Sequence, residues 1–181
     1  MPIATATISP PCSSAPPPEA AEEIAQANRA MVANAAPALR ARLRTLTRAR
    51  AFDSPEYANL VDRITAPFQM RFLTHPHPDW TATRTAPSVY RAMMTRSGDE
   101  FAVDGTLRRW DGRRYYRDIT VPTLVLAGKY DVFLTASIEM DQRIEPAHLR
   151  ILPRSSHLAI LEQPREFLGT VREFLNDVTG D

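Results

Sequence analysis

The chain has 181 residues, of which 44% are hydrophobic and 24% are charged, and its formal net charge is +1. This composition is ordinary for a globular domain, and so small a net charge gives no electrostatic reason to expect binding to nucleic acid or to an anionic membrane. Cys12 is the single cysteine, which excludes an intramolecular disulfide and a cysteine-built zinc site. The sequence shows neither an apolar stretch of the roughly 20 residues that a membrane-spanning helix needs nor a secretory signal, so we expect a cytoplasmic protein.

The first two-thirds of the chain predict a tail followed by helices. Residues 1–18 are rich in proline, which removes backbone donors and prevents a continuous helix, so we expect a tail there, with a strand remnant at Ile3–Ser9 as the alternative. From Glu19 to about Met94 the pattern is helical. Asp53-Ser54-Pro55-Glu56 predicts the start of a helix that runs toward Phe72. Apolar residues recur at helical spacing before it, at Ile24, Ala27, Met31, Ala35, Leu39, Leu43 and Leu46.

The last third changes to an α/β pattern. The apolar run Val121–Gly128 predicts a buried parallel strand, and a short helix is expected at Thr135–Ile144. A second strand is predicted at His148–Leu152, followed by an amphipathic helix at Gln163–Val178. Strand, helix, strand and helix in this order are typical of an α/β fold.

An acid and a histidine follow the two predicted strands. Asp131 comes just after the first strand, and His157 follows the second. Because ligands and catalytic groups gather at the carboxyl ends of parallel strands, these side chains are candidates for a pair in which the carboxylate orients the imidazole. A lone Asp and a lone His in loops are more often structural, so the spacing alone leaves both interpretations open.

The local sequence around these two residues resembles a known fold. Leu124–Asp131 is similar to the α/β-hydrolase segment in which a buried strand ends in Gly-x-x-Asp and presents the triad acid. Ser156-His157-Leu158 with the following Leu161–Pro164 is similar to the segment that presents the triad histidine, and the acid precedes the histidine as in that fold. Four upstream segments resemble the helical cap of the proline iminopeptidase group: Asp53–Tyr57, Val89–Met94, Gly98–Phe101 and Gly105–Asp111.

The resemblance covers residues 20–178 and implies the C-terminal half of such an enzyme. The expected fold is a partial α/β-hydrolase fold, with a helical cap followed by the last two strands and helices of the parallel sheet. The expected domains are a tail or strand remnant at 1–18, the cap at 19–116 and the C-terminal part of the core at 117–181.

The resemblance also implies a substrate-binding residue. Glu100 matches the cap glutamate that binds the free amino terminus of the peptide substrate, and a carboxylate is suited to an ammonium group. The group usually places a second amine-binding glutamate directly after the triad acid, where this chain has Val132. That difference weakens the expectation for aminopeptidase recognition and leaves another small amide or ester as the alternative substrate.

The sequence contains no nucleophile elbow. No two of its glycines have the Gly-x-Ser-x-Gly spacing, and no His-Gly-Gly oxyanion loop is present. Ser97 and Ser137 are serines that one would test as nucleophiles, but neither follows a strand into a helix. His75 and His77 lie without an acid or cysteine cluster, so we predict no metal site and no cofactor.

Three functional hypotheses follow from these observations. The chain is a truncated serine hydrolase of the proline iminopeptidase group that keeps Asp131 as the acid and His157 as the base; or it is a non-catalytic binding module derived from a hydrolase; or it is one half of a split enzyme. The expected partners are a small peptide, amide or ester substrate and, for the split enzyme, a chain that supplies the N-terminal hydrolase half. Neither nucleic acid nor a membrane is expected as a partner.

Overall fold

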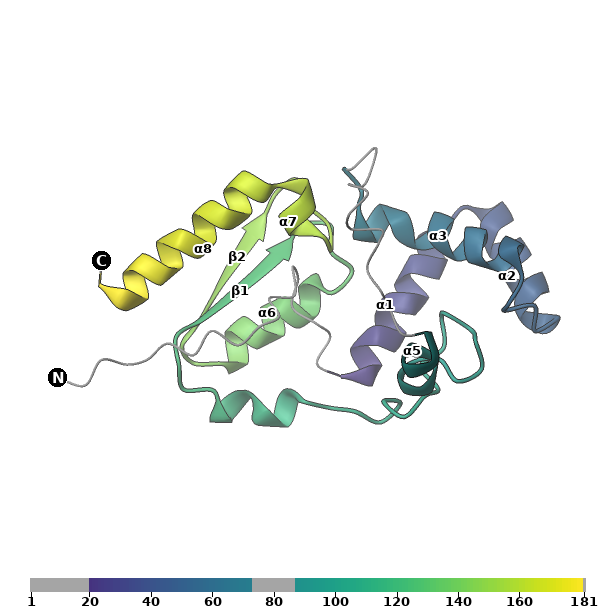
Figure 1. The fold of residues 1–181 in the computed structure, drawn as a ribbon, viewed down its shortest axis with the longest axis horizontal. Helices are drawn as coiled ribbons and strands as arrows, with labels where there is room; N and C mark the ends of the chain where they lie inside the picture. The colour runs from purple at the N-terminus through teal and green to yellow at the C-terminus, as the bar shows by residue number, and fades with distance from the viewer. Residues whose placement is uncertain (1–19, 73–86, 181) are drawn as a thin grey trace.

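The computed structural model describes residues 20–72 and 87–180. The tail or strand remnant predicted for residues 1–18 lies outside these ranges, as do His75 and His77. The described residues form a helical part and an α/β part, which lie side by side in Figure 1. No helix in these ranges combines the length and the apolar character needed to cross a membrane.

The helical part contains α1 (Ala21–Asn34), α2 (Pro37–Arg48), α3 (Pro55–Gln69) and α5 (Pro87–Met93). Both α1 and α2 pack against α3. We call the cluster of buried side chains that these three helices share the helical core; it consists of Met31, Leu43, Leu46, Tyr57, Leu60 and Ile64. The helical spacing predicted before α3 is therefore confirmed, because three of its apolar positions belong to this core.

The start of α3 agrees with the sequence prediction. Ser54 caps the helix, since its Oγ accepts a hydrogen bond from the Tyr57 N–H at 3.1 Å, and Pro55 occupies the first helical position. The helix ends at Gln69, before the predicted end at Phe72. It stops there because backbone carbonyl groups of its last turn accept hydrogen bonds from the α/β part.

The α/β part is built on two parallel strands, β1 (Thr123–Gly128) and β2 (Ala147–Leu152), which pair along their whole length. The helix α6 (Leu134–Arg143) connects them, and β2 leads through the short α7 (Ala159–Glu162) into α8 (Pro164–Thr179). Both α6 and α8 pack on both strands, and Figure 1 shows them on opposite sides of the sheet. The predicted order of strand, helix, strand and helix is confirmed.

Alternation along β1 explains why this strand is apolar on both of its faces. Leu124 and Leu126 face α8, where Leu126 belongs to a buried cluster with Leu152, Ala159 and Phe167. Since successive side chains of a strand point to opposite faces, Val125 and Ala127 lie on the α6 side, and both are buried. A continuous apolar run is therefore what this position in the fold requires.

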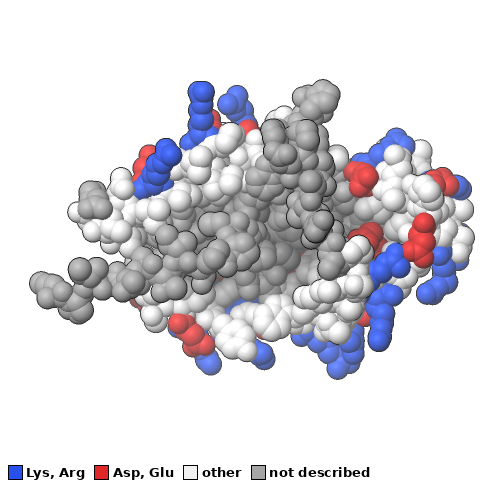
Figure 2. Space-filling view, viewed as in Figure 1, with Lys and Arg blue, Asp and Glu red and all other residues white. Residues whose placement is uncertain are grey.

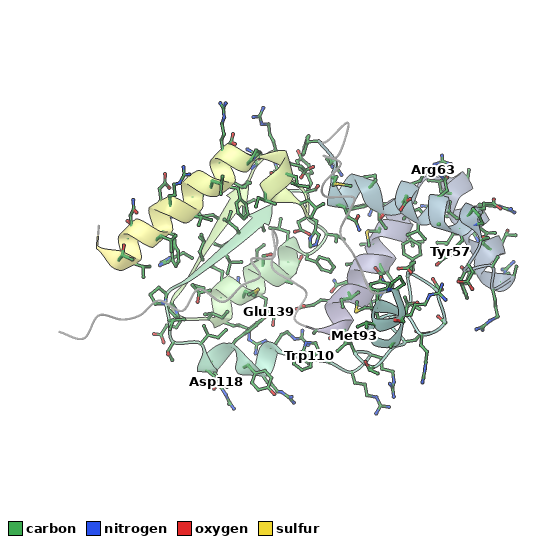
Figure 3. The ribbon with its side chains drawn as sticks, viewed as in Figure 1. Tyr57, Arg63, Met93, Trp110, Asp118 and Glu139 are labelled. Carbon is green, nitrogen blue, oxygen red and sulfur yellow. The ribbon has the colours of Figure 1, made fainter. Side chains whose placement is uncertain are left out.

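Two short helices were not predicted from the sequence, namely α7 and the 3₁₀-helix η1 (Arg113–Asp118). The buried Tyr116 anchors η1, and the Arg143 guanidinium of α6 lies 5.1 Å from the centre of its ring. Figure 3 accordingly shows Asp118 and Glu139 in the α/β part, away from Tyr57 in the helical part. Helices this short have too few residues for a hydrophobic period to be visible.

Charged side chains of both signs project around the edge of the face shown in Figure 2. Two pairs join neighbouring segments of the helical part: Arg42 with Glu56, and Arg91 with Asp53. All four side chains are about half or more exposed, so solvent screens both pairs and each contributes little to stability.

Candidate active site

The end of β1 is held against the segment that follows β2. The Lys129 N–H donates to the Leu152 carbonyl at 2.9 Å, and the Tyr130 N–H donates to the Ser155 carbonyl at 3.0 Å. The next residue is Asp131, whose own N–H closes a tight turn onto the Gly128 carbonyl at 3.1 Å. The turn therefore brings the Asp131 carboxylate to the carboxyl end of the sheet, as predicted.

The segment after β2 is fixed by buried polar groups. Ser155 and Ser156 are fully buried, and Gln163 is nearly so. The Gln163 Oε1 accepts hydrogen bonds from the Arg154 N–H at 2.7 Å and from the Ser155 hydroxyl at 3.1 Å. Buried polar groups that are satisfied in this way hold a loop in one conformation. The loop delivers His157 beside Asp131.

Asp131 and His157 form a hydrogen-bonded pair. The His157 Nδ1 lies 3.1 Å from Oδ2 and 3.2 Å from Oδ1 of Asp131. The Asp131 side chain is completely buried, whereas the His157 side chain is 25% exposed. A carboxylate only accepts hydrogen bonds, so Nδ1 carries the hydrogen and Nε2 remains free to accept a proton. The structure thus brings together the two residues that the sequence nominated.

Phe133 supports both members of the pair. Its N–H donates to Asp131 Oδ1 at 2.8 Å, and its ring meets the His157 imidazole edge-on with ring centres 5.4 Å apart. The first contact fixes the carboxylate and the second limits rotation of the imidazole. Sequence reasoning did not assign a role to Phe133, because its contact with a residue beyond β2 is made only in the folded chain.

Glu100 lies in the helical part, in the turn that follows α5. Its Oε2 accepts a hydrogen bond from the Tyr90 hydroxyl at 2.8 Å. The Tyr57 hydroxyl accepts from the Glu100 N–H at 2.9 Å and donates to Asp99 Oδ1 at 2.7 Å. The two tyrosines therefore position Glu100, one through its side chain and the other through its backbone. Both lie in segments that carry the resemblance, but nothing in the sequence spacing indicated these contacts.

The two tyrosine hydroxyl groups that donate hydrogen bonds to these acids have raised pKa values. Burial, followed by the hydrogen bond to Asp99, raises the pKa of Tyr57 above its ordinary value. Burial, followed by the hydrogen bond to Glu100, raises the pKa of Tyr90 in the same way. Both hydroxyl groups thus remain hydrogen-bond donors at neutral pH.

Glu100 and the Asp131–His157 pair are connected through apolar contacts. Phe101, next to Glu100, packs against the helical core, and so does Val132, next to Asp131. The helical core therefore contacts the residue directly after Glu100 and the residue directly after Asp131. The Glu100 carboxylate itself is hydrogen-bonded to the Tyr90 hydroxyl.

The two serines considered as nucleophiles do not accompany His157. Ser137 is completely buried in α6, where its hydroxyl donates to the Phe133 carbonyl at 3.3 Å. The Ser97 Oγ accepts a hydrogen bond from the Asp99 N–H at 3.2 Å in the turn of the helical part. Each hydroxyl is thus part of local backbone structure.

Comparisons with known proteins show which proteins this chain resembles. No family model matches the chain. A proline iminopeptidase of Saccharolobus solfataricus is 30% identical over 131 residues, which are 70% of this chain and 41% of that protein. The crystal structure of a Mycobacterium smegmatis proline iminopeptidase superimposes with a TM-score of 0.74 at 27% identity, covering 90% of this chain and 55% of that one.

This chain is a relative of the proline iminopeptidases. The crystal structure of VinJ is also similar, with a TM-score of 0.77 and 28% identity over 89% of this chain and 55% of that chain. The expected partial α/β-hydrolase fold is thereby confirmed, in the form of a helical region and a two-stranded parallel sheet. The chain spans about half or less of the length of the relatives that it matches.

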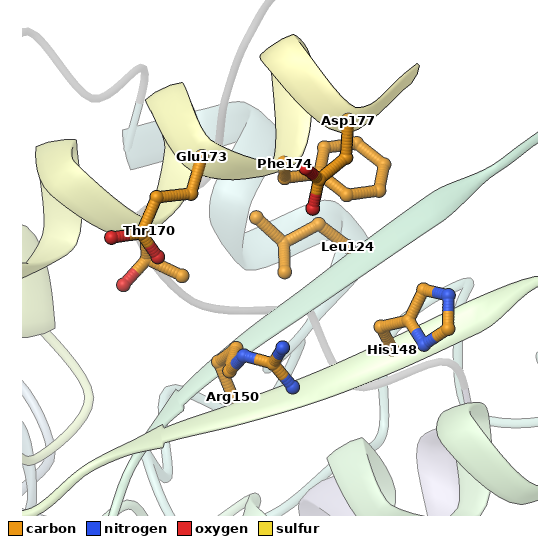
Figure 4. A pocket seen from close by; sticks show the side chains of 7 residues that line it. All are labelled: Leu124, His148, Arg150, Thr170, Glu173, Phe174 and Asp177. Atoms are coloured by element: carbon orange, nitrogen blue, oxygen red, sulfur yellow. The ribbon is translucent and has the colours of Figure 1, made fainter. Parts of the chain in front are cut away.

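Two cavities lie at opposite ends of the sheet. One, of about 250 Å³, is lined by Val132 and Phe133 directly after Asp131, together with residues of α1 and α6. The other, of about 170 Å³, lies between α8 and the first halves of both strands (Figure 4); it is lined by Leu124, His148, Arg150, Thr170, Glu173, Phe174 and Asp177. The first cavity is the nearer to the candidate pair along the chain, but neither Asp131 nor His157 lines it.

Potential metal-binding side chains do not cluster in the described part of the chain. Within residues 20–72 and 87–180, no three histidine, cysteine or acidic side chains come together as ligands for a metal ion. What the arrangement offers is an imidazole oriented through its Nδ1, and a separate carboxylate in the helical part.

Proposed function

We propose that this chain supplies the acid, the base and an amine-binding group of a serine hydrolase similar to the proline iminopeptidases. Its substrate is a small peptide with an N-terminal proline, or a related small amide or ester. The observation that carries the proposal is the contact between the buried Asp131 carboxylate and the His157 Nδ1 at the carboxyl ends of β1 and β2.

In this proposal each residue has a step. His157 Nε2 takes the proton of a serine hydroxyl as that oxygen attacks the substrate carbonyl, and then gives the proton to the departing amine or alcohol. Asp131 holds the imidazole in the Nδ1–H form and stabilises the imidazolium that forms in between. Water then attacks the acyl-enzyme with His157 again taking the proton, which releases the acid product and regenerates the serine.

The serine itself comes from outside this sequence in our proposal. The 181 residues contain no Gly-x-Ser-x-Gly, and Ser97 and Ser137 are engaged elsewhere. A polypeptide segment carrying the nucleophile elbow and the oxyanion donors of a hydrolase would complete the site. Such a segment is the partner that we propose for the chain.

Glu100 is proposed as the anchor for the substrate ammonium group. Its carboxylate already accepts a hydrogen bond from a neutral donor, the Tyr90 hydroxyl, and its second oxygen would accept an N–H of the substrate. Val132 stands where relatives of this group usually have a second glutamate, so a single anion would face the ammonium. We therefore expect weaker selection for a free amino terminus than two anions would give.

The test is hydrolysis of proline p-nitroanilide and p-nitrophenyl acetate by the purified chain, alone and with the N-terminal half of the Saccharolobus solfataricus relative added. We expect turnover only with the added half. His157→Ala should abolish it, and Asp131→Asn should lower kcat by about 10³–10⁴-fold because the imidazole loses its orientation. Turnover by the chain alone, lost in both variants, would show that it holds a nucleophile of its own. Turnover that both variants retain would refute the assigned roles.

A further inference from the structure

The segment that carries His157 is joined to the end of α3 by a seam of hydrogen bonds. The His157 N–H donates to the Phe68 carbonyl at 3.1 Å, and the Leu158 N–H donates to the Gln69 carbonyl at 2.9 Å. These carbonyls belong to the last turn of α3 and have no partner within the helix. We call residues 153–158 the histidine loop; this loop therefore also serves as the C-terminal cap of α3 in the helical part.

Other hydrogen bonds of the seam have their donors in the segment after α3 and their acceptors near His157. The Arg71 N–H donates to the Ser156 Oγ at 3.1 Å, and the Phe72 N–H donates to Glu162 Oε1 at 2.8 Å. The backbone immediately after α3 thus bonds to side chains around His157. As a result, neither side of the seam can shift without breaking several hydrogen bonds.

Glu162 accepts hydrogen bonds both from the segment after α3 and from the residue before His157. Its Oε2 accepts hydrogen bonds from the Ser156 N–H and from the Ser156 hydroxyl, the latter at 2.8 Å, while its Oε1 accepts from Phe72. Hydrogen bonds to an ionised acceptor are about twice as strong as neutral ones. Because Ser156 is completely buried, its N–H and hydroxyl lose their acceptor if the carboxylate is removed.

We propose that Glu162 is a positioning residue for His157. Its carboxylate fixes the preceding residue, Ser156, to the end of α3 and thereby holds the imidazole opposite Asp131. This inference rests on the catalytic role proposed above for His157. It also makes the base dependent on the helical part, so displacement of α3 would move the imidazole.

The experiment uses ¹⁵N NMR of the His157 imidazole, together with hydrogen exchange of its backbone N–H, in the full chain. Glu162→Gln keeps the size of the side chain but replaces one acceptor oxygen by an amide donor, which faces the donors of the seam. We expect His157 to lose the single Nδ1–H form and to populate both tautomers. Its N–H should exchange about tenfold faster, as expected for loss of one charge-assisted hydrogen bond.

Two variants serve as controls. Glu166→Gln makes the same chemical change at an exposed position of α8 and should leave both readouts unchanged. Asp131→Asn should disturb the tautomer directly. Tautomer and exchange in Glu162→Gln that match those of Glu166→Gln would overturn the positioning role while the pair stands. An unchanged tautomer in Asp131→Asn would instead show that the pair does not orient His157, and the proposed function would fail with it.

Folding is checked by circular dichroism on each variant. Should Glu162→Gln unfold, Ser156→Ala decides the question, since it keeps the carboxylate and removes only the hydroxyl between Arg71 and Glu162. We expect a smaller change of the His157 tautomer in the same direction. A folded Ser156→Ala chain with an undisturbed tautomer and unchanged exchange would contradict the proposal.

Discussion

A Cβ atom on Gly128 would lie 2.2 Å from the carbonyl oxygen of Ser156. The last residue of β1 is therefore in direct contact with the backbone that leads into His157. Ser155 atoms lie within 2.5 Å of the same point, so a side chain at this position would meet backbone on more than one residue. Only glycine permits this approach, and the approach sets the distance between the two residues of the pair.

Gly128→Ala should destabilise the chain and separate the pair. The added methyl group meets backbone rather than a flexible side chain, so the histidine loop must move, at a cost of about 1–3 kcal/mol. Urea unfolding followed by circular dichroism measures the loss. Gly169→Ala is the matched control, because Gly169 lies inside α8 and a Cβ there would meet no atom within 4 Å. It should stabilise the chain by about 0.5–1 kcal/mol. Equal effects of the two substitutions would argue against the close contact.

Glu100→Gln should affect substrates with a free amino terminus selectively. With the completed enzyme, the loss of the carboxylate should raise KM for proline p-nitroanilide by about tenfold or more, since a charge-assisted hydrogen bond to the ammonium is lost. KM for p-nitrophenyl acetate, which has no amine, should hardly change. Steady-state kinetics with both substrates provide the test, and a parallel rise in the two KM values would exclude an amine-specific role.

Tyr57→Phe should lower stability at neutral pH and change its dependence on alkaline pH. The variant leaves Asp99 and the Glu100 N–H without their partner, at a cost of about 1–3 kcal/mol. Because the folded pKa of Tyr57 lies above the unfolded value of about 10, the unfolded chain binds fewer protons between these values and stability falls as pH rises through them.

The difference between the parent chain and Tyr57→Phe should therefore shrink above pH 10, by about 1 kcal/mol at pH 11. The raised pKa of Tyr90 also lowers stability in that range, but Tyr90 is present in both chains, so its contribution cancels in the difference. Urea unfolding at pH 7, 9, 10 and 11 measures the difference. A constant difference over this range would mean that the Tyr57 hydroxyl is not kept protonated by the fold.

Ser54→Ala should destabilise α3 through the loss of its cap. The Tyr57 N–H loses the Oγ acceptor, which costs about 1 kcal/mol. A lower Tm with an unchanged helical signal at low temperature is the expected result. Ser54→Asp offers the comparison, since aspartate also caps helices and should retain most of the stability. Identical losses in both variants would point to a different role for the Ser54 hydroxyl.

The sequence by itself determined the main helices and strands and the two residues of the candidate pair. Helical spacing located three residues of the helical core (Met31, Leu43 and Leu46), and the apolar run located β1. Asp131 and His157 were found because each follows a strand. These features depend on residues that are close together in the chain, so a local sequence pattern is enough to predict them. Residues 94–112, inside the segment expected to be the helical cap, contain turns rather than helix.

Only the tertiary structure decided what holds these groups in place. The Tyr57 contacts with Asp99 and Glu100 span more than forty residues, and the Phe72 contact with Glu162 spans ninety. No period or motif encodes such pairs, since they arise where separate elements meet. The end of α3 at Gln69 has the same origin. Its last carbonyls find their donors in the histidine loop, and a helix whose terminal groups are satisfied by a distant segment stops where that segment binds.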